Sequence, residues 1–335
     1  MDALRNKRIE WIDIIRGIAI VAVVMGHLRY SSYNEGLKDT IYSFHMAMFF
    51  VLAGCTTHLS YKDEFVPFIK KKAVALVIPY TVWNFLVLPY SYNHGFLYEN
   101  LMSRFEIFIS GRCNHGGFFW FLLTLFAYQL IFAIYAKMIE PRVKNFAFRV
   151  ISLMLIYVPV IVLHRVFGEN GEGFGLATQM YLFYIPFMVG VCLLRYKEVW
   201  NILFNKWSFC VFVLLALYVP GMYGDMNNLG HVSRITGIGI TCILVKMIQD
   251  GHFFNVQIRN ALTVIGKNSL GIYIFHYLFV DMFARNSAGV LGRMDPLALF
   301  CLYLPISLVV ALLCIGIIKI IEQSSIASAM RYRRS

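Results

Sequence analysis

The residues most suited to chemistry lie in one stretch near the N-terminus, IEWIDIIRGIAIVAVVMGHL, at residues 9–28. A membrane-spanning helix needs about 20 mostly apolar residues, so this one must carry Asp13 and Arg16 in its first turns. Helical geometry then puts Arg16 and His27 on one face, about 16 Å apart along the axis. Ionisable residues inside a span usually face the bundle interior or a water-filled cavity. The pattern predicts a helix that lines a site, with a cation at one end and an imidazole at the other.

Two further histidines lie in apolar segments. His45, the second residue of FHMAMFFVLAG, is expected near the depth of His27, and His276, in SLGIYIFHYLF, is expected near the middle of the bilayer. An imidazole, with an unperturbed pKa near 6.5, can accept a hydroxyl proton at neutral pH or act as a nucleophile. Each residue also has a purely structural interpretation. Arg16 could extend to the membrane interface, and the histidines could be hydrogen-bonded contacts between helices.

The composition identifies the elements that must hold these residues. Of 335 residues, 59% are hydrophobic and only 14% are charged, and the mean hydropathy is +0.66. Soluble domains carry about 25% charged residues, so the sequence predicts an all-α, polytopic membrane helical bundle. In so apolar a chain, a net charge of +12 indicates basic cytoplasmic loops, not a nucleic-acid partner. The seven cysteines have no zinc-binding spacing, and no metal is expected.

Apolar runs predict about ten transmembrane helices in a single transmembrane domain, residues 1–335. The expected spans are 10–28, 41–60, 73–92, 118–137, 147–164, 179–195, 208–223, 230–248, 268–285 and 297–320. Counted over the alternating loops, 21 Lys and Arg residues fall on the side of the termini and eight on the other side. Because cytoplasmic loops are enriched in basic residues, we expect both termini in the cytoplasm. Arg16 would then lie near the cytoplasmic face and His27 toward the outer face.

Other candidate residues lie at the predicted ends of spans. Lys70, Lys71 and Lys72 precede the third predicted span and could bind phosphates, although ordinary positive-inside charge explains them equally well. Trp120 begins the fourth span and could contact a substrate or belong to an interfacial aromatic belt. Arg112 and His115, in the polar loop before it, could contact a substrate.

Four segments together resemble one family. They are DIIRGIAIVAVVMGH (13–27), FHMAMFFVLAG (44–54), FFWFLLTLF (118–126) and NSLGIYIFH (268–276). The chain resembles the integral-membrane acyltransferase-3 family over nearly its whole length, and most closely its fucose 4-O-acetylase-like branch. The most specific element of the match is an arginine and a histidine with ten residues between them in the first span, here Arg16 and His27. Many members carry an Arg-x-x-Arg pair at the start of the third span, where this sequence has Lys70–Lys72.

The resemblance implies transfer of an acetyl group from cytoplasmic acetyl-CoA to a hydroxyl of a sugar, glycolipid or polysaccharide. It implies a catalytic His27 and a donor-binding Arg16, and Trp120 matches the aromatic residue at the start of the family's fourth span. From their positions in the sequence, Arg16 and His45 are further catalytic candidates, and Lys70, Lys71 and Lys72 are candidates to bind the donor. The candidates to bind the acceptor are Trp120, His115, Arg112 and His276. The expected location is the bacterial inner membrane, with the lipid bilayer and a glycan or glycolipid as partners. Homo-oligomerisation is left open, as is the choice between direct transfer and an acetyl-histidine intermediate.

A different class of protein also fits these residues. In a polytopic transporter or glycan exporter, Arg16, His27, His45 and His276 would line a permeation path. Transporters often show duplicated halves with broken spans at matching positions. No such repeat is found in the sequence, which favours the enzyme.

Overall fold

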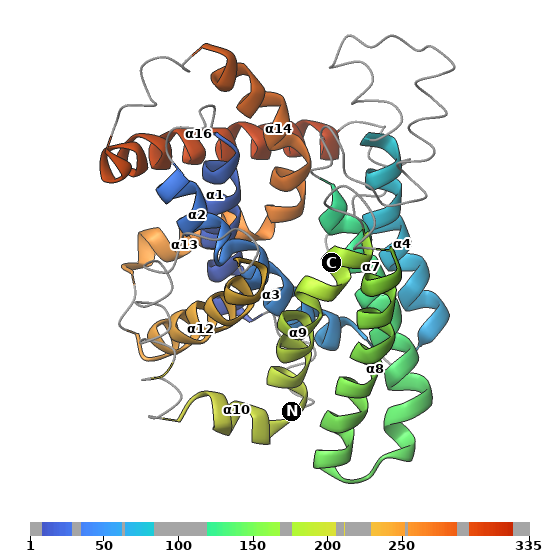
Figure 1. The fold of residues 1–335 in the computed structure, drawn as a ribbon. Helices are drawn as coiled ribbons and strands as arrows, with labels where there is room; N and C mark the ends of the chain where they lie inside the picture. Colours follow the sequence, from blue (N-terminus) through green and yellow to red (C-terminus); the bar gives the residue numbers. More distant parts are fainter. Residues whose placement is uncertain are drawn as a thin grey trace. The chain divides into compact units, whose positions relative to one another are not determined.

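The computed structural model describes residues 9–28, 35–61, 64–83, 119–167, 176–205, 211, 229–251, 254–286 and 295–323. All regular elements in these ranges are helices, as the composition predicted, and none is a strand (Figure 1). The chain divides into two compact units, one formed by residues 1–52 and 192–335 and the other by residues 53–191. Each unit is described by itself below.

The first unit is built around α1 (Glu10–His27), which lies among α2, α13, α14 and α16 in Figure 1. Nearly every side chain from Trp11 to Gly26 is buried, including Asp13. A helix that is buried on all sides must be apolar on all sides, which explains the run GIAIVAVVMG. The elements of this unit are α1, α2 (Glu35–Tyr42), the first half of α3 (His45–Ser60), α10 (Lys197–Leu203), α12 (Leu229–Gln249), α13 (Val256–Lys267), α14 (Ser269–Asn286) and α16 (Pro296–Gln323).

Two glycines allow α13 to cross α1 at close range. A Cβ on Gly17 would collide with the carbonyl oxygen of Leu262, and one on Gly266 would collide with that of Asp13. Small residues at such a crossing let helix backbones approach within a membrane. One turn further toward the N-terminus of α1, Arg259 on α13 forms an ion pair with Glu10 at 3.3 Å. Together these contacts fix α13 to the half of α1 that carries Arg16.

The second unit contains α4, α7, α8 and α9 together with the second half of α3. Its bounds are α4 Phe65–Val82, α7 Trp120–Ile134, α8 Phe146–Phe167 and α9 Leu176–Arg195, whose last four residues belong to the first unit. A π-helical turn, Tyr135–Ile139, and a 3₁₀ turn, Glu140–Arg142, extend α7. Gly54 on α3 lies against the backbone of α9 at Phe187 and Val191, where a Cβ would not fit. This unit is therefore a second set of closely packed apolar helices.

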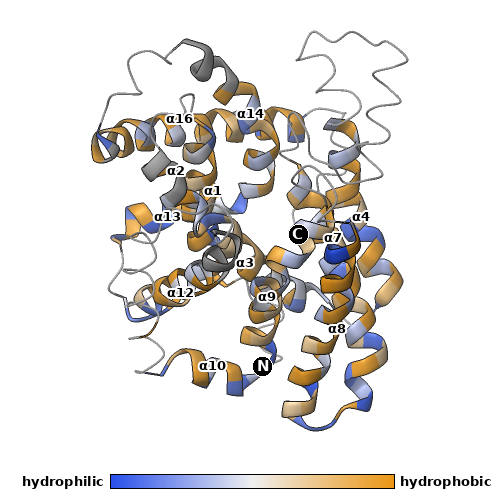
Figure 2. Cartoon of the chain, in the orientation of Figure 1, coloured by the Kyte–Doolittle hydropathy of each residue, from blue (hydrophilic) through white to orange (hydrophobic). Residues whose placement is uncertain are grey.

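Five helical segments among the described residues are long and apolar enough to cross a membrane. They are Thr40–Ser60, Trp120–Arg142, Phe146–Val166, Leu176–Arg195 and Leu297–Gln323, and two shorter apolar helices cover 235–249 and 269–280. The segment α1 is not among the five, because Glu10, Asp13 and Arg16 interrupt its apolar character. Figure 2 shows α16 and most of α8 in the colours of hydrophobic residues. The structure is thus a helical membrane bundle, but these five segments do not establish the predicted ten spans.

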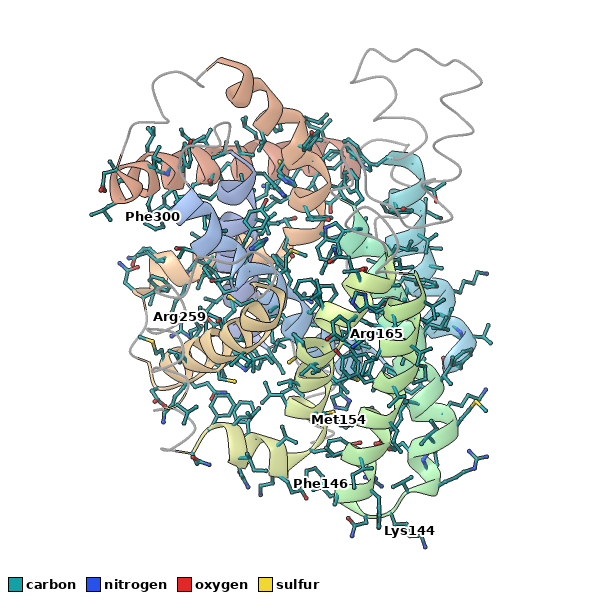
Figure 3. The ribbon with its side chains drawn as sticks, in the orientation of Figure 1. Lys144, Phe146, Met154, Arg165, Arg259 and Phe300 are labelled. Atoms are coloured by element: carbon teal, nitrogen blue, oxygen red, sulfur yellow. The ribbon has the colours of Figure 1, made fainter. Side chains whose placement is uncertain are left out.

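The surface of α8 has the character of a lipid-facing helix. Phe148, Leu155 and Val162 are all more than half exposed, so apolar side chains are exposed along the whole helix. Charged residues lie only toward its two ends. Figure 3 shows Lys144 just before the helix and Arg165 near its other end, with Met154 between them. This arrangement suits a helix whose middle contacts hydrocarbon and whose ends reach the interfaces.

Most predicted spans match observed helices to within three residues at each described end, with α1 differing by one. The second predicted span, 41–60, agrees with the membrane-crossing segment Thr40–Ser60, although a turn at Ser43–Phe44 separates α2 from α3 within it. Beside this turn, Nδ1 of His45 donates to the carbonyl of Ile41 at 2.7 Å. One predicted boundary is wrong: the third span was predicted to begin at residue 73, whereas α4 begins at Phe65 and includes the lysine run. The span 208–223 lies outside the described residues except for residue 211.

Candidate functional site

The candidate site centres on two histidines, His27 and His276. His27 is the last residue of α1 and is half-buried; His276 lies in the middle of α14 and is fully buried. Nδ1 of His27 and Nε2 of His276 are 2.8 Å apart. The ring centroids are 5.0 Å apart and the ring planes differ by 16°. Since the centroid separation exceeds the N–N distance by about two ring radii, the rings meet edge to edge in nearly one plane. This is the geometry of a ring-to-ring hydrogen bond.

The other nitrogen of His276 is held by its own helix. Nδ1 of His276 lies 2.7 Å from the carbonyl oxygen of Tyr273 and 3.1 Å from that of Ile272. A carbonyl oxygen only accepts hydrogen bonds, so Nδ1 of His276 carries a proton and donates it. Both nitrogens of this buried imidazole are therefore engaged, and its orientation is fixed by α14.

Arg16 lies on the same unbroken helix as His27, as the sequence predicted. They are eleven positions apart on α1, which corresponds to about 16 Å along the axis. Arg16 is half-buried, and the neighbouring carboxyl group of Asp13 is buried. Gly17, where α13 crosses α1, is the next residue after Arg16. The unit therefore positions a guanidinium group in the second turn and an imidazole at the C-terminal end of one buried helix.

His45 is also buried, and it contacts Ile41 and Tyr42 of α2. Its Nδ1 donates to the carbonyl of Ile41, and its ring meets that of Tyr42 edge to face at 4.9 Å. The Tyr42 ring in turn lies against Gly26, the residue before His27, close enough that a Cβ on Gly26 would be 3.1 Å from it. The structure thus places Tyr42 against α1 beside His27 and packs His45 onto Tyr42. The predicted catalytic role of His45 stays a prediction.

The lysine run lies inside a helix and not in the predicted loop before it. Lys70 and Lys71 are exposed on α4, and Lys72 extends its ammonium group over the ring of Phe68 at 5.3 Å. The run is helical because lysine favours helices and because Phe68 anchors the first turns by packing edge to face on Tyr61, at 5.2 Å. These lysines belong to the second unit. The exposure of Lys70 and Lys71 leaves them accessible to anions.

The remaining predicted substrate-binding residues are described only in part. Trp120 begins α7 in the second unit, is half-buried, and stacks on Phe183 with centroids 5.6 Å apart. Arg112 and His115 lie outside the described residues. Within the described ranges, no group of three or more His, Cys, Asp or Glu side chains could hold a metal ion.

The His27–His276 pairing is the feature that sequence reasoning missed. The sequence nominated both histidines separately, with His276 as a substrate-binding residue, but gave no sign that they contact each other. The contribution of α13 was also missed, because residues 256–267 were assigned to a loop. A signal was present: Asn255 caps this helix by accepting from the amide of Ile258 at 2.9 Å, and asparagine is a favoured N-cap residue.

Comparison with known families agrees with this helical membrane architecture. The acyltransferase-3 family model, described as an acyltransferase domain, matches residues 9–316. The match covers the first unit's α1, α13 and α14 and all helices of the second unit. The chain therefore belongs to the acyltransferase-3 family and is a membrane acyltransferase. No curated protein and no solved structure matched in the corresponding comparisons.

Proposed function

We propose that the protein is an O-acetyltransferase that moves an acetyl group from cytoplasmic acetyl-CoA to a carbohydrate hydroxyl. The acceptor would be a sugar, glycolipid or polysaccharide at the outer side of a bacterial inner membrane, as in the fucose 4-O-acetylase-like branch of the family. The observation that carries the proposal is the placement of Arg16 in the second turn of one buried helix and of the hydrogen-bonded imidazole of His27 at its C-terminal end. An extended donor could bind at the first residue and react at the second.

The chemistry assigned to His27 is general-base catalysis. The acceptor hydroxyl oxygen attacks the thioester carbonyl carbon while its proton passes to the imidazole. The resulting intermediate breaks its C–S bond, and the imidazolium returns the proton to the departing thiolate sulfur. The products are an O-acetyl ester and the free thiol of CoA. In the alternative route the imidazole itself first takes the acetyl group and then passes it to the hydroxyl.

Arg16 is proposed to bind the donor. Its planar guanidinium group presents five hydrogen-bond donors and stays charged at all physiological pH values, which suits phosphate or carbonyl oxygens of CoA. The exposed Lys70 and Lys71, with Lys72, are proposed to attract the CoA phosphates. The residues proposed to bind the acceptor are Trp120, Arg112, His115 and His276.

A transfer assay with purified protein tests the proposal directly. The protein in detergent would be given radiolabelled acetyl-CoA with candidate sugars, glycolipids or polysaccharide fragments, and both thioester loss and labelled ester would be measured. We expect ester formation that depends on the acceptor, with release of one thiol per ester. Transport of a glycan without any thioester cleavage, under conditions where the protein is folded, would overturn the proposal in favour of an exporter.

A further inference from the structure

We propose that His276 is a positioning residue that fixes the tautomer of His27, so that Nε2 of His27 is the nitrogen that takes the acceptor's proton. The inference rests on the proposed function for the role of His27, but the tautomer itself is a property of the resting protein. It can therefore be tested separately.

The first step concerns the protonation of His276. Its Nδ1 must donate a proton, because its partners are the carbonyl oxygens of Tyr273 and Ile272. The side chain has no solvent exposure. A buried cation is costly unless it is paired with a negative charge, and His276 hydrogen-bonds to two carbonyls and another imidazole. The neutral form, with its proton on Nδ1, is thus favoured, which leaves Nε2 of His276 with a lone pair.

The second step is that the tautomer of His276 determines the tautomer of His27. Nε2 of His276 can only accept, so in the 2.8 Å contact Nδ1 of His27 must be the donor. The tautomer follows from the hydrogen-bond network, which is the ordinary way to assign it. A neutral imidazole that carries its proton on Nδ1 has its lone pair on Nε2. The hydrogen bond made by one ring nitrogen thus determines which nitrogen acts as the base.

The third step concerns the charged state formed during the reaction. When His27 takes a proton at Nε2, the hydrogen bond from its Nδ1 becomes charge-assisted and strengthens. His27 is also the last residue of α1, where the partial negative charge of the helix C-terminus favours a cation. Both effects act on the imidazolium more than on the neutral ring. They therefore stabilise the transition state relative to the resting site.

A plain helix-to-helix contact would explain the same distance without any role in catalysis. The two explanations differ in what they require of the partner at position 276. A structural contact needs a side chain of suitable volume, whereas tautomer control needs an acceptor at the position of Nε2. Glutamine supplies such an acceptor through its side-chain carbonyl, and phenylalanine retains ring volume without one.

Nitrogen-15 NMR of the protein, labelled at its histidine rings, reports the tautomer in the absence of substrate. Spectra of wild-type protein and of His27→Asn would identify the signals of His27 by difference. We expect a protonated Nδ1 and an unprotonated Nε2 for His27. A His27 ring with its proton on Nε2 would overturn the inference, whatever the kinetic results.

Kinetics of His276→Phe and His276→Gln give the second test. We expect His276→Phe to lower kcat at least about tenfold with little change in KM for acetyl-CoA, since an orienting partner of a catalytic histidine can be worth up to about 10⁴-fold. His276→Gln should recover much of this loss and keep the His27 tautomer. Equal activity of folded Phe and Gln variants, at any level, would contradict tautomer control.

Controls separate failure of this inference from failure of the proposed function. His164→Phe is a matched control, because Nδ1 of His164 lies 3.3 Å from the hydroxyl of Thr178 in the second unit; its activity should stay within about twofold of wild type. If His276→Phe fails to fold, the inference is tested by the NMR spectrum of the wild-type protein and by the activity and tautomer of His276→Gln. Full activity of His27→Ala would refute the function assigned to His27, while the NMR result would still report the pairing. An essential His27 with the opposite tautomer would refute the inference alone.

Discussion

His27 and His276 share a hydrogen bond of 2.8 Å although 249 residues separate them in the sequence. The bond joins the C-terminal end of α1 to the middle of α14. It brings together one half-buried imidazole and one fully buried imidazole whose other nitrogen is held by the α14 backbone. A solvent-exposed histidine can carry its proton on either ring nitrogen. The hydrogen bond to His276 favours the tautomer of His27 that carries its proton on Nδ1.

The first prediction concerns His27 as base or nucleophile. His27→Ala should lower acetyl transfer at least about a hundredfold, since general-base catalysis is typically worth about 10²–10⁴ in rate. Binding of acetyl-CoA should persist, because Arg16 is retained. Transfer rates and donor binding would be measured on the same purified protein. His45→Ala, which removes a ring packed on Tyr42, is expected to cause a smaller loss. Near wild-type transfer by His27→Ala would refute the mechanism.

The second prediction concerns Arg16. Arg16→Lys keeps the charge but loses the planar five-donor group, so acetyl-CoA binding should weaken, and Arg16→Ala should weaken it further. Both proteins should still insert and purify. Isothermal titration calorimetry in detergent would measure the affinities. If Arg16→Ala binds acetyl-CoA as tightly as wild type does, Arg16 serves only to anchor α1 at the membrane interface.

The third prediction concerns the crossing of α1 and α13. Gly266→Ala places a Cβ against the backbone of Asp13, which cannot move as a side chain can. Overpacking of this kind typically costs about 1–3 kcal/mol, so the thermal unfolding midpoint should fall. Gly316→Ala on α16 is the matched control, because a Cβ there meets nothing within 4 Å. Equal midpoints for the two variants would show that the crossing is looser than described.

The fourth prediction concerns topology. With 21 basic residues expected on one side and eight on the other, both termini and the lysine run of α4 should face the cytoplasm. Membrane-impermeant thiol reagents applied to intact cells should label Cys113, but not a cysteine introduced at Ser335 or Lys70. Labelling at Ser335 from outside would reverse the proposed donor side.

The sequence predicted the helices well because hydrophobic periodicity and length are local properties. A run such as GIAIVAVVMG requires burial wherever it lies, and α1 was found within one residue of its predicted bounds. The start of α4 was placed too late because a lysine run resembles a loop, whereas Phe68 and Tyr61 hold it in a helix. Charge alone did not reveal this packing.

The candidate site was predictable only in its parts. Arg16 and His27 share a helix, so their spacing could be derived from residue numbers alone. The pairing of His27 with His276 depends on how α14 packs against α1. The turn at Ser43–Phe44 lies beside a local hydrogen bond from the His45 side chain to the carbonyl of Ile41. The histidine pairing has no counterpart in local sequence pattern, because it is set by a tertiary contact.

The anchoring of His276 also has a consequence for membrane energetics. A continuous series of titratable groups across a bilayer would conduct protons and dissipate the gradient that the membrane maintains. In the direction of α14, the series that passes from His27 to His276 ends at His276, because Nδ1 of His276 is bound to the carbonyl of Tyr273, which does not accept a proton at physiological pH. A proton taken by His27 therefore has no path through His276 to the far side of α14. The hydrogen bond between the two histidines can support acid–base chemistry at His27 without opening a proton leak through α14.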